Sequence, residues 1–135
     1  DTYFKCNKGR LKLREGNIEY SFVYYDRENK SGPKKSEVIY YHPLKNTALK
    51  AILTSSLGIL VTVKKQREIY FIDNIKIHID KVNNLGSFIE IEAIDESGKI
   101  GEVNLRKQCK KYLELFEIHD EDLIDCSYSD MILKL

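Results

Sequence analysis

The stretch Phe88-Ile89-Glu90-Ile91-Glu92 decides the fold, because carboxylates occupy every second position between apolar residues. Side chains two residues apart on a β-strand point to the same side of the sheet. Glu90 and Glu92 therefore share one face, and the apolar residues share the other. The stretch predicts a strand with one charged face and one apolar face.

Similar alternation recurs elsewhere, and each stretch carries mostly one sign of charge. Ile77-His78-Ile79-Asp80 is acidic, whereas Arg10-Leu11-Lys12-Leu13-Arg14 and Val63-Lys64-Lys65-Gln66-Arg67 are basic. The cations that share a face are Lys12 with Arg14 and Lys65 with Arg67.

This sorting of charge bears on function. In a sheet covered on one side, charged faces simply meet water, and that alternative explains any single strand here. A solvated face usually mixes both signs, however, whereas these strands separate them. Converging faces would offer cations for phosphates and carboxylates for a metal ion, which is the chemistry of a polyanion-processing site.

Composition limits the function classes. The 135 residues, 42% of them hydrophobic, predict a single domain with an ordinary core. A net charge of +1 provides no global field for nucleic acid, so we expect a small-molecule partner. The three separated cysteines suit the reducing cytoplasm, and neither a spanning segment nor a signal-peptide region points to a membrane.

Period-two segments separated by turn residues predict an antiparallel sheet. The expected strands are Tyr3–Cys6, Arg10–Glu15, Tyr20–Asp26, Glu37–Tyr41, Leu60–Tyr70, Ile75–Val82 and Phe88–Ile94. Apolar stripes predict helices at about 47–57, ending at Gly58, and at about 103–116, with a further short helix in the tail, 122–135. The fold class is therefore α+β.

Closing such a sheet into an antiparallel β-barrel would place the charged faces inside and the helices outside. Burying so many ions without compensation would cost several kcal/mol each. A bound polyphosphate and a divalent metal are the natural means of satisfying them. We therefore expect a ligand-filled lumen.

An ordered set of motifs then matches a known family. The set consists of Asp1-Thr2-Tyr3-Phe4, Gly9 to Glu15, Tyr24-Tyr25-Asp26-Arg27, Gly32-Pro33-Lys34-Lys35-Ser36, Val63 to Arg67, His78 to Val82, and Leu85 to Glu92. In this order the chain resembles the CYTH superfamily, which includes class IV adenylyl cyclases, thiamine triphosphatases and inorganic triphosphatases. The Gly-Pro-Lys segment is most similar to the bacterial class IV cyclase branch. The resemblance implies an antiparallel tunnel that holds a triphosphate such as ATP or inorganic triphosphate.

The resemblance also implies roles for individual residues. The phosphate ligands it implies are Lys12, Arg14, Arg27, Lys34, Lys35, Lys65 and Arg67. The metal carboxylates it implies are Asp80, Glu90 and Glu92, with Mg²⁺ or Mn²⁺ as the ion. No side chain is assigned as a catalytic residue, because the nucleophile would be water in a hydrolase and the ribose 3′ hydroxyl in a cyclase.

The chain departs from the family pattern at its start. The family begins with a Glu-any-Glu-any-Lys strand, which supplies metal and phosphate ligands, and only then reaches the segment that starts at Asp1. We therefore expect an N-terminally incomplete domain with weak turnover. Unpaired strand edges would favour association, for example as a homodimer.

The histidines His42, His78 and His119 have no zinc-like or triad spacing and receive no role, although His78 is expected to face the lumen or to form a hydrogen bond. Three functions stay open. They are an enzyme that cyclises or hydrolyses a triphosphate, a non-catalytic triphosphate- or nucleotide-binding module, and an interaction domain whose charges are merely solvated.

Overall fold

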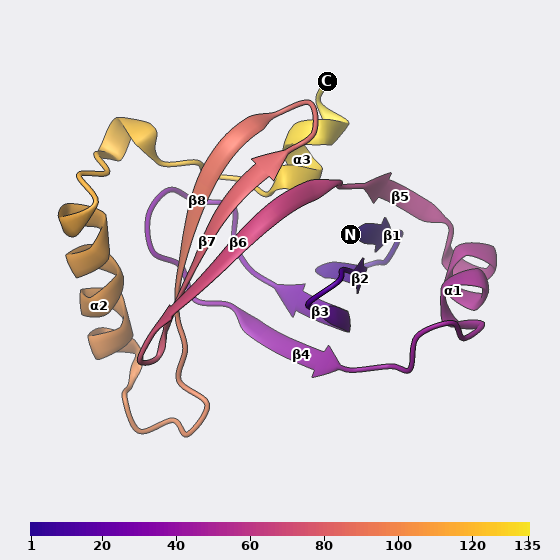
Figure 1. The fold of residues 1–135 in the computed structure, drawn as a ribbon, viewed down its shortest axis with the longest axis horizontal. Helices are drawn as coiled ribbons and strands as arrows, with labels where there is room; N and C mark the ends of the chain where they lie inside the picture. Colours follow the sequence, from indigo (N-terminus) through magenta and orange to yellow (C-terminus); the bar gives the residue numbers. More distant parts are fainter. The chain divides into compact units, whose positions relative to one another are not determined.

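The computed structural model describes residues 1–135, which form two compact units interleaved in the sequence. Unit 1 comprises Asp1–Glu28, Ser36–Lys64 and Tyr128–Leu135, and unit 2 comprises Asn29–Lys35 and Lys65–Ser127. Each unit contains one antiparallel sheet and at least one helix (Figure 1). The α+β class is thus confirmed, whereas closure into one barrel and the single-domain organisation stay predictions.

The sheet of unit 1 has five strands in the order β4-β3-β2-β1-β5. Its strands are β1 (Thr2–Phe4), β2 (Arg10–Glu15), β3 (Tyr20–Asp26), β4 (Glu37–Tyr41) and β5 (Ile59–Thr62). The first four are sequential hairpin neighbours, as their turn residues predict. The strands β2, β3 and β4 have the bounds that alternation predicts.

The helices of unit 1 flank this sheet. Helix α1 (Leu49–Leu57) joins β4 to β5 and contacts β1, and it ends at Gly58, whose φ of 82° few side chains tolerate. None of its residues is buried, so it covers the sheet less completely than its apolar stripe predicts. Helix α3 (Tyr128–Leu133) contacts β5, and Asp130 on it pairs with Arg10 at 2.6 Å (Figure 1).

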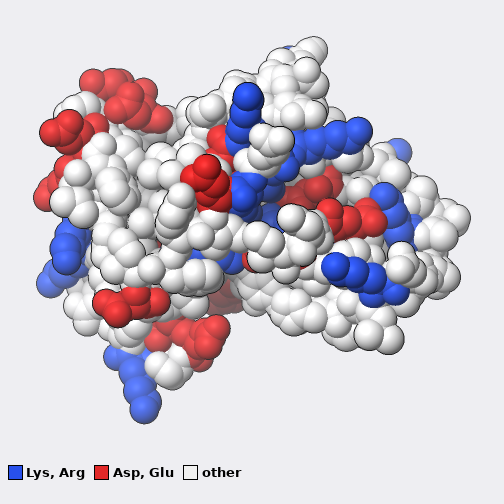
Figure 2. Space-filling view, viewed as in Figure 1, with Lys and Arg blue, Asp and Glu red and all other residues white.

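The sheet of unit 2 consists of β6 (Lys65–Ile72), β7 (Ile75–Val82) and β8 (Gly86–Ala93) in that order. Helix α2 (Glu102–Leu115) lies along β8 and is followed by a 3₁₀ turn, η1 (Asp120–Asp122) (Figure 1). Figure 2 shows carboxylates gathered at the end of unit 2 that carries η1, with both signs of charge elsewhere on the visible face.

The core of unit 2 explains which face of its sheet carries charge. Ile75 and Ile77 are buried against Tyr112 of α2, with Ile91 and Ala93 of β8 beside them. Burying each large apolar side chain contributes about 2 kcal/mol. Alternation then directs the even-numbered residues of β7 to the opposite face of the sheet.

One expected strand is wrong in its extent. The alternating run Leu60–Tyr70 becomes two strands, β5 and β6, in different sheets. Val63 is buried, and its N–H donates to the Asp1 carbonyl at 2.8 Å, but at Lys65 the backbone pairs with Val82 of β7 instead. Alternation records the direction of side chains but not the identity of the pairing strand, so it could not reveal this change of partner.

No helix in the chain combines the length and the apolar character that crossing a membrane requires.

Candidate metal and phosphate site

The charged face of unit 2 is set by strand register. Arg67 of β6 lies opposite Asp80 of β7, and His78 of β7 lies opposite Glu90 of β8. Directly opposed residues of an antiparallel pair project from the same face. Lys65 and Glu92 lie on this face too, two residues from Arg67 and Glu90 respectively. One face of this sheet therefore carries cations on β6 and carboxylates on β7 and β8.

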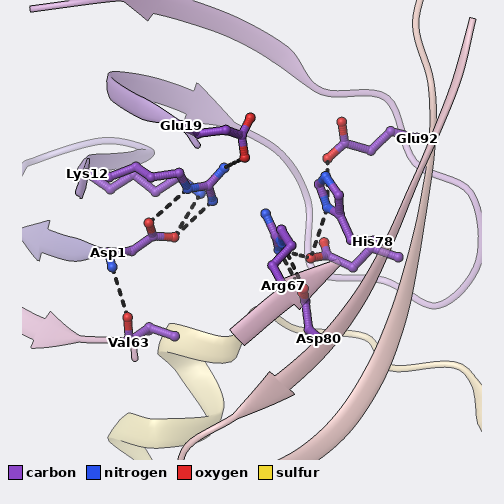
Figure 3. Close-up of polar contacts among 10 residues, drawn as sticks. Asp1, Lys12, Glu19, Val63, Arg67, His78, Asp80 and Glu92 are labelled. Carbon is purple, nitrogen blue, oxygen red and sulfur yellow. Dashed lines mark hydrogen bonds and ion pairs between the residues drawn. The ribbon is translucent and has the colours of Figure 1, made fainter. Parts of the chain in front are cut away.

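Arg67 links two of the predicted metal carboxylates. Its Nε and Nη2 donate to the two carboxylate oxygens of Asp80 at 2.7 and 2.6 Å, and Nη2 also donates to Glu90 Oε1 at 2.6 Å (Figure 3). Asp80 is 1% exposed, so its charge depends on this forked contact. Asp80 therefore orients Arg67 in this structure.

His78 lies beside the other two carboxylates. Its Nδ1 is 3.7 Å from Glu90 Oε1 and 4.0 Å from Glu92 Oε1 (Figure 3). Both distances exceed a hydrogen bond, and neither ring nitrogen has a hydrogen-bond partner although the residue is buried. Of the two settings expected for His78, facing a lumen or forming a hydrogen bond, the second is not seen in this structure.

Electrostatics keep Glu90 ionised. Burial raises the pKa of Glu90, but the neighbouring His78 and the positive charge of Arg67 together outweigh burial and lower this pKa well below its usual value. Glu90 is thus a carboxylate anion at neutral pH. The ligand atoms of His78, Glu90 and Glu92 all lie within 4.8 Å of one another, which is the spacing of a candidate metal site.

Unit 1 holds a second cluster, built around cations. Asp1 accepts two hydrogen bonds from Arg14, both 2.9 Å long, and lies 3.6 Å from Lys12 Nζ (Figure 3). Glu19 lies 3.4 Å from Arg14. Register explains this pairing, because Thr2 opposes Leu13 and so brings Asp1 alongside Arg14.

Two cations of unit 1 lie near the aromatic ring of Tyr25. Lys12 Nζ lies 5.2 Å and the Arg27 guanidinium carbon 5.4 Å from the centre of its ring. Cation–π contacts of this length stabilise a charge while leaving its donors directed elsewhere. Lys12, Arg14 and Arg27, predicted as phosphate ligands from two separate motifs, are therefore brought into one cluster.

The two loop lysines are placed differently. Lys34 Nζ donates to the backbone carbonyl of Lys30 at 2.9 Å within its own loop, and Lys35 is exposed. Their contribution to phosphate binding stays a prediction.

Sequence reasoning missed three participants, namely His78, Asp1 and Glu19. His78 could have been found, because it lies two residues before Asp80 on the same strand and so shares its face. Asp1 and Glu19 approach Arg14 only through strand pairing and a turn, which single-strand alternation does not encode.

The sequence of this chain matches one known domain family. The CYTH domain family matches residues 1–123, so the chain belongs to the CYTH family, whose enzymes act on triphosphates. No protein of curated function matches the chain.

Three similar solved structures come from Pyrococcus. The PH1012 protein of Pyrococcus horikoshii OT3 has a TM-score of 0.71 at 19% identity, covering 96% of this chain and 79% of its own. A conserved hypothetical protein of Pyrococcus furiosus has a TM-score of 0.68 at 17% identity, with coverages of 96% and 79%. The PH1819 protein of Pyrococcus horikoshii OT3 has a TM-score of 0.66 at 18% identity, with coverages of 98% and 81%. At these identities the likeness concerns the fold.

Proposed function

We propose that this protein is a metal-dependent enzyme that acts on a triphosphate, either cyclising a nucleoside triphosphate or hydrolysing the triphosphate chain. The observation that carries the proposal is the single charged face of β6, β7 and β8, where Lys65 and Arg67 are followed by His78, Glu90 and Glu92. Membership of the CYTH family supports it. The proposal also assigns phosphate binding to the Lys12 and Arg14 cluster of unit 1.

The residues present fit a divalent metal. Glu90 and Glu92 supply anionic oxygens, and the unsatisfied buried ring of His78 lies within reach of both. When bound, a divalent metal would neutralise phosphate oxygens and offset the charge that develops during phosphoryl or nucleotidyl transfer.

The cations of the chain would bind and orient the phosphates. Arg67 is held rigid by Asp80 and Glu90, so it can present its guanidinium without first losing side-chain entropy. Lys12 and Arg14 already contact Asp1, so a triphosphate at these residues competes with an internal carboxylate. This competition favours a highly charged ligand over a monophosphate.

Product analysis tests the proposal. The 135-residue chain is incubated with inorganic triphosphate or ATP, each with Mg²⁺ or Mn²⁺ and with a chelator. We expect weak but metal-dependent turnover, seen either as phosphate release from one of the substrates or as cyclic nucleotide and pyrophosphate from ATP. Replacing Lys65→Met should lower kcat/KM by about 100-fold, as loss of one charge-stabilising contact commonly does.

The matched control is Lys107→Met, which removes an exposed lysine of α2 and should leave kcat/KM unchanged. Saturable binding without product would indicate a non-catalytic triphosphate-binding module rather than an enzyme. If the chain neither bound a triphosphate nor formed product, it would be an interaction domain whose charged faces are solvated.

A further inference from the structure

Helix α2 has a charged outer side on which the two signs are separated along the helix. Tyr112 is buried in the core of unit 2, so the opposite side of α2 faces outward. Lys107, Lys110 and Glu114 share that side, because residues three, four and seven apart on a helix lie on one face. With the exposed Glu117, which follows the helix, they form what we call the outer stripe. Figure 2 shows cations beside α2 and carboxylates gathered toward the end of unit 2 that carries η1.

This order of charges does not stabilise the helix itself. Lys107 and Lys111 are four residues apart, and like charges at that spacing destabilise a helix. The same holds for Arg106 and Lys110. Glu114 lies in the last turn, where the helix dipole favours cations, and no basic residue occupies that turn. The energetics of α2 alone therefore do not account for the arrangement.

The charges of the outer stripe are also not neutralised inside the chain. Arg106 pairs with Glu102 at 3.2 Å near the start of α2, but no residue of the outer stripe takes part in an ion pair. Charged surfaces attract partners whose charges are arranged in the complementary order. The outer stripe is therefore available for a partner with carboxylates opposite its lysines and cations opposite its glutamates.

A second copy of the outer stripe has that order when it runs antiparallel to the first. A twofold axis at the level of Tyr112 places Lys110 opposite the partner's Glu114, and Lys107 opposite the partner's Glu117, since each pair is centred on that residue. The axis repeats both pairs, as an interface between identical surfaces requires. The outer stripe is therefore complementary to itself.

We propose that α2 pairs with α2 of a second copy of this chain, antiparallel and through the outer stripe, to form a twofold homodimer. This goes beyond the proposed function and is independent of it, because neither a metal nor a triphosphate takes part. The surface also differs from the strand edges at which the sequence predicts association.

The size of the contact predicts its strength. The 14 residues of α2 span about 21 Å, and one helix of that length offers less than the roughly 800 Å² per partner of a typical stable interface. Exposed ion pairs add little at high salt. The homodimer is therefore weak, reversible and salt-dependent.

Sedimentation equilibrium of the 135-residue chain tests the homodimer. We expect reversible dimerisation at about 50 mM NaCl, with a dissociation constant at least tenfold higher at about 500 mM NaCl, because salt screens exposed charges. A chain that stays monomeric at low salt up to about 1 mM protein, where even a weak interface associates, would overturn the proposal.

An exchange of charges between two variants tests the antiparallel order. Lys110→Glu and Glu114→Lys should each raise the dissociation constant at least tenfold, because like charges then meet on both sides of the twofold axis. An equimolar mixture of the two variants should dimerise within about threefold of the unaltered chain, since opposite charges face each other again. A mixture that associates no better than either variant alone would overturn the proposal.

The matched control is Lys81→Glu, which makes the same charge change at an exposed residue near the end of β7 away from Ile75 and Ile77, the residues that pack on α2. It should leave the dissociation constant unchanged. Equal weakening by Lys81→Glu and Lys110→Glu would attribute the loss to net charge and overturn the proposal. Unchanged dimerisation of Lys110→Glu would place the interface elsewhere, for example at a strand edge, and would overturn it too.

Cross-linking of the unaltered chain keeps the proposal testable without any replacement. A mixture of isotopically light and heavy chains is treated with a carbodiimide, which joins an amine to a carboxylate that it touches. We expect cross-linked peptides that join Lys110 of one isotope to Glu114 of the other. If every such peptide carried a single isotope, the contact would lie inside one chain, and the proposal would be wrong.

Discussion

Arg67 and Asp80 face each other across β6 and β7, and both side chains are removed from water. The Arg67 side chain is 10% exposed and that of Asp80 is 0% exposed, with contacts of 2.6 and 2.7 Å between them. A buried ion pair need not stabilise more than an apolar pair would, but removing one partner leaves an uncompensated charge. The two residues therefore depend on each other.

The replacement Arg67→Met tests this dependence. We expect it to lower the free energy of unfolding by about 3 kcal/mol, because Asp80 stays buried without its cation. Denaturant unfolding at neutral pH provides the measurement. The control Arg106→Met breaks an exposed pair with Glu102 and should cost less than about 0.5 kcal/mol. Equal effects of the two replacements would contradict this account of the Arg67 contact.

Asp95 organises the start of helix α2. Its carboxylate accepts hydrogen bonds from the N–H groups of Gly101 at 3.0 Å and Ile100 at 3.2 Å, immediately before the helix. The Gly101 hydrogen bond is the largest cause that lowers the pKa of Asp95, and that of Ile100 adds to it. Asp95 thus fixes the end of the loop that follows β8.

This lowered pKa predicts the sign of a pH effect. A carboxylate whose pKa is lower in the folded state stabilises the protein above its unfolded-state pKa, and the contribution is lost as pH falls through the folded-state pKa. We expect Asp95→Asn to reduce stability at neutral pH and to flatten the dependence of stability on pH in the acid range. Thermal unfolding between neutral and acid pH measures this change.

The control for that prediction is Asp125→Asn, at an exposed position outside any helix or strand. Its pH dependence should follow that of the unaltered chain. If Asp95→Asn also kept the full acid-range slope, the hydrogen bonds at Gly101 and Ile100 would not be the cause of the effect.

Most elements could be predicted from the sequence because their side chains alternate. Strands β2, β3, β4 and β7 have the predicted bounds, since each is delimited by turn residues. Strands β5 and β6 could not be separated, because the alternating pattern continues while the pairing partner changes.

Part of the candidate site could also be predicted from the sequence. Alternation correctly placed Lys65 and Arg67 on one face, and likewise Glu90 and Glu92. It could not reveal that Arg67 binds Asp80 or that His78 lies between two carboxylates, because those contacts depend on register between strands. Contacts that depend on the pairing of distant strands could therefore not be predicted from this sequence.

At the scale of the whole molecule, each unit concentrates its cations beside internal carboxylates. Unit 1 pairs Lys12 and Arg14 with Asp1, and unit 2 pairs Arg67 with Asp80 and Glu90. Clusters of this kind hold polar side chains in fixed positions at low net charge.

The measurement that tests the central claim most directly is calorimetric titration of the chain with inorganic triphosphate, with Mn²⁺ and with a chelator. We predict saturable binding of one triphosphate per chain, at least tenfold tighter with Mn²⁺ and weaker at high salt, because both the cations and the metal contribute. The absence of saturable binding in either condition would contradict the assignment of these charged faces to a triphosphate site.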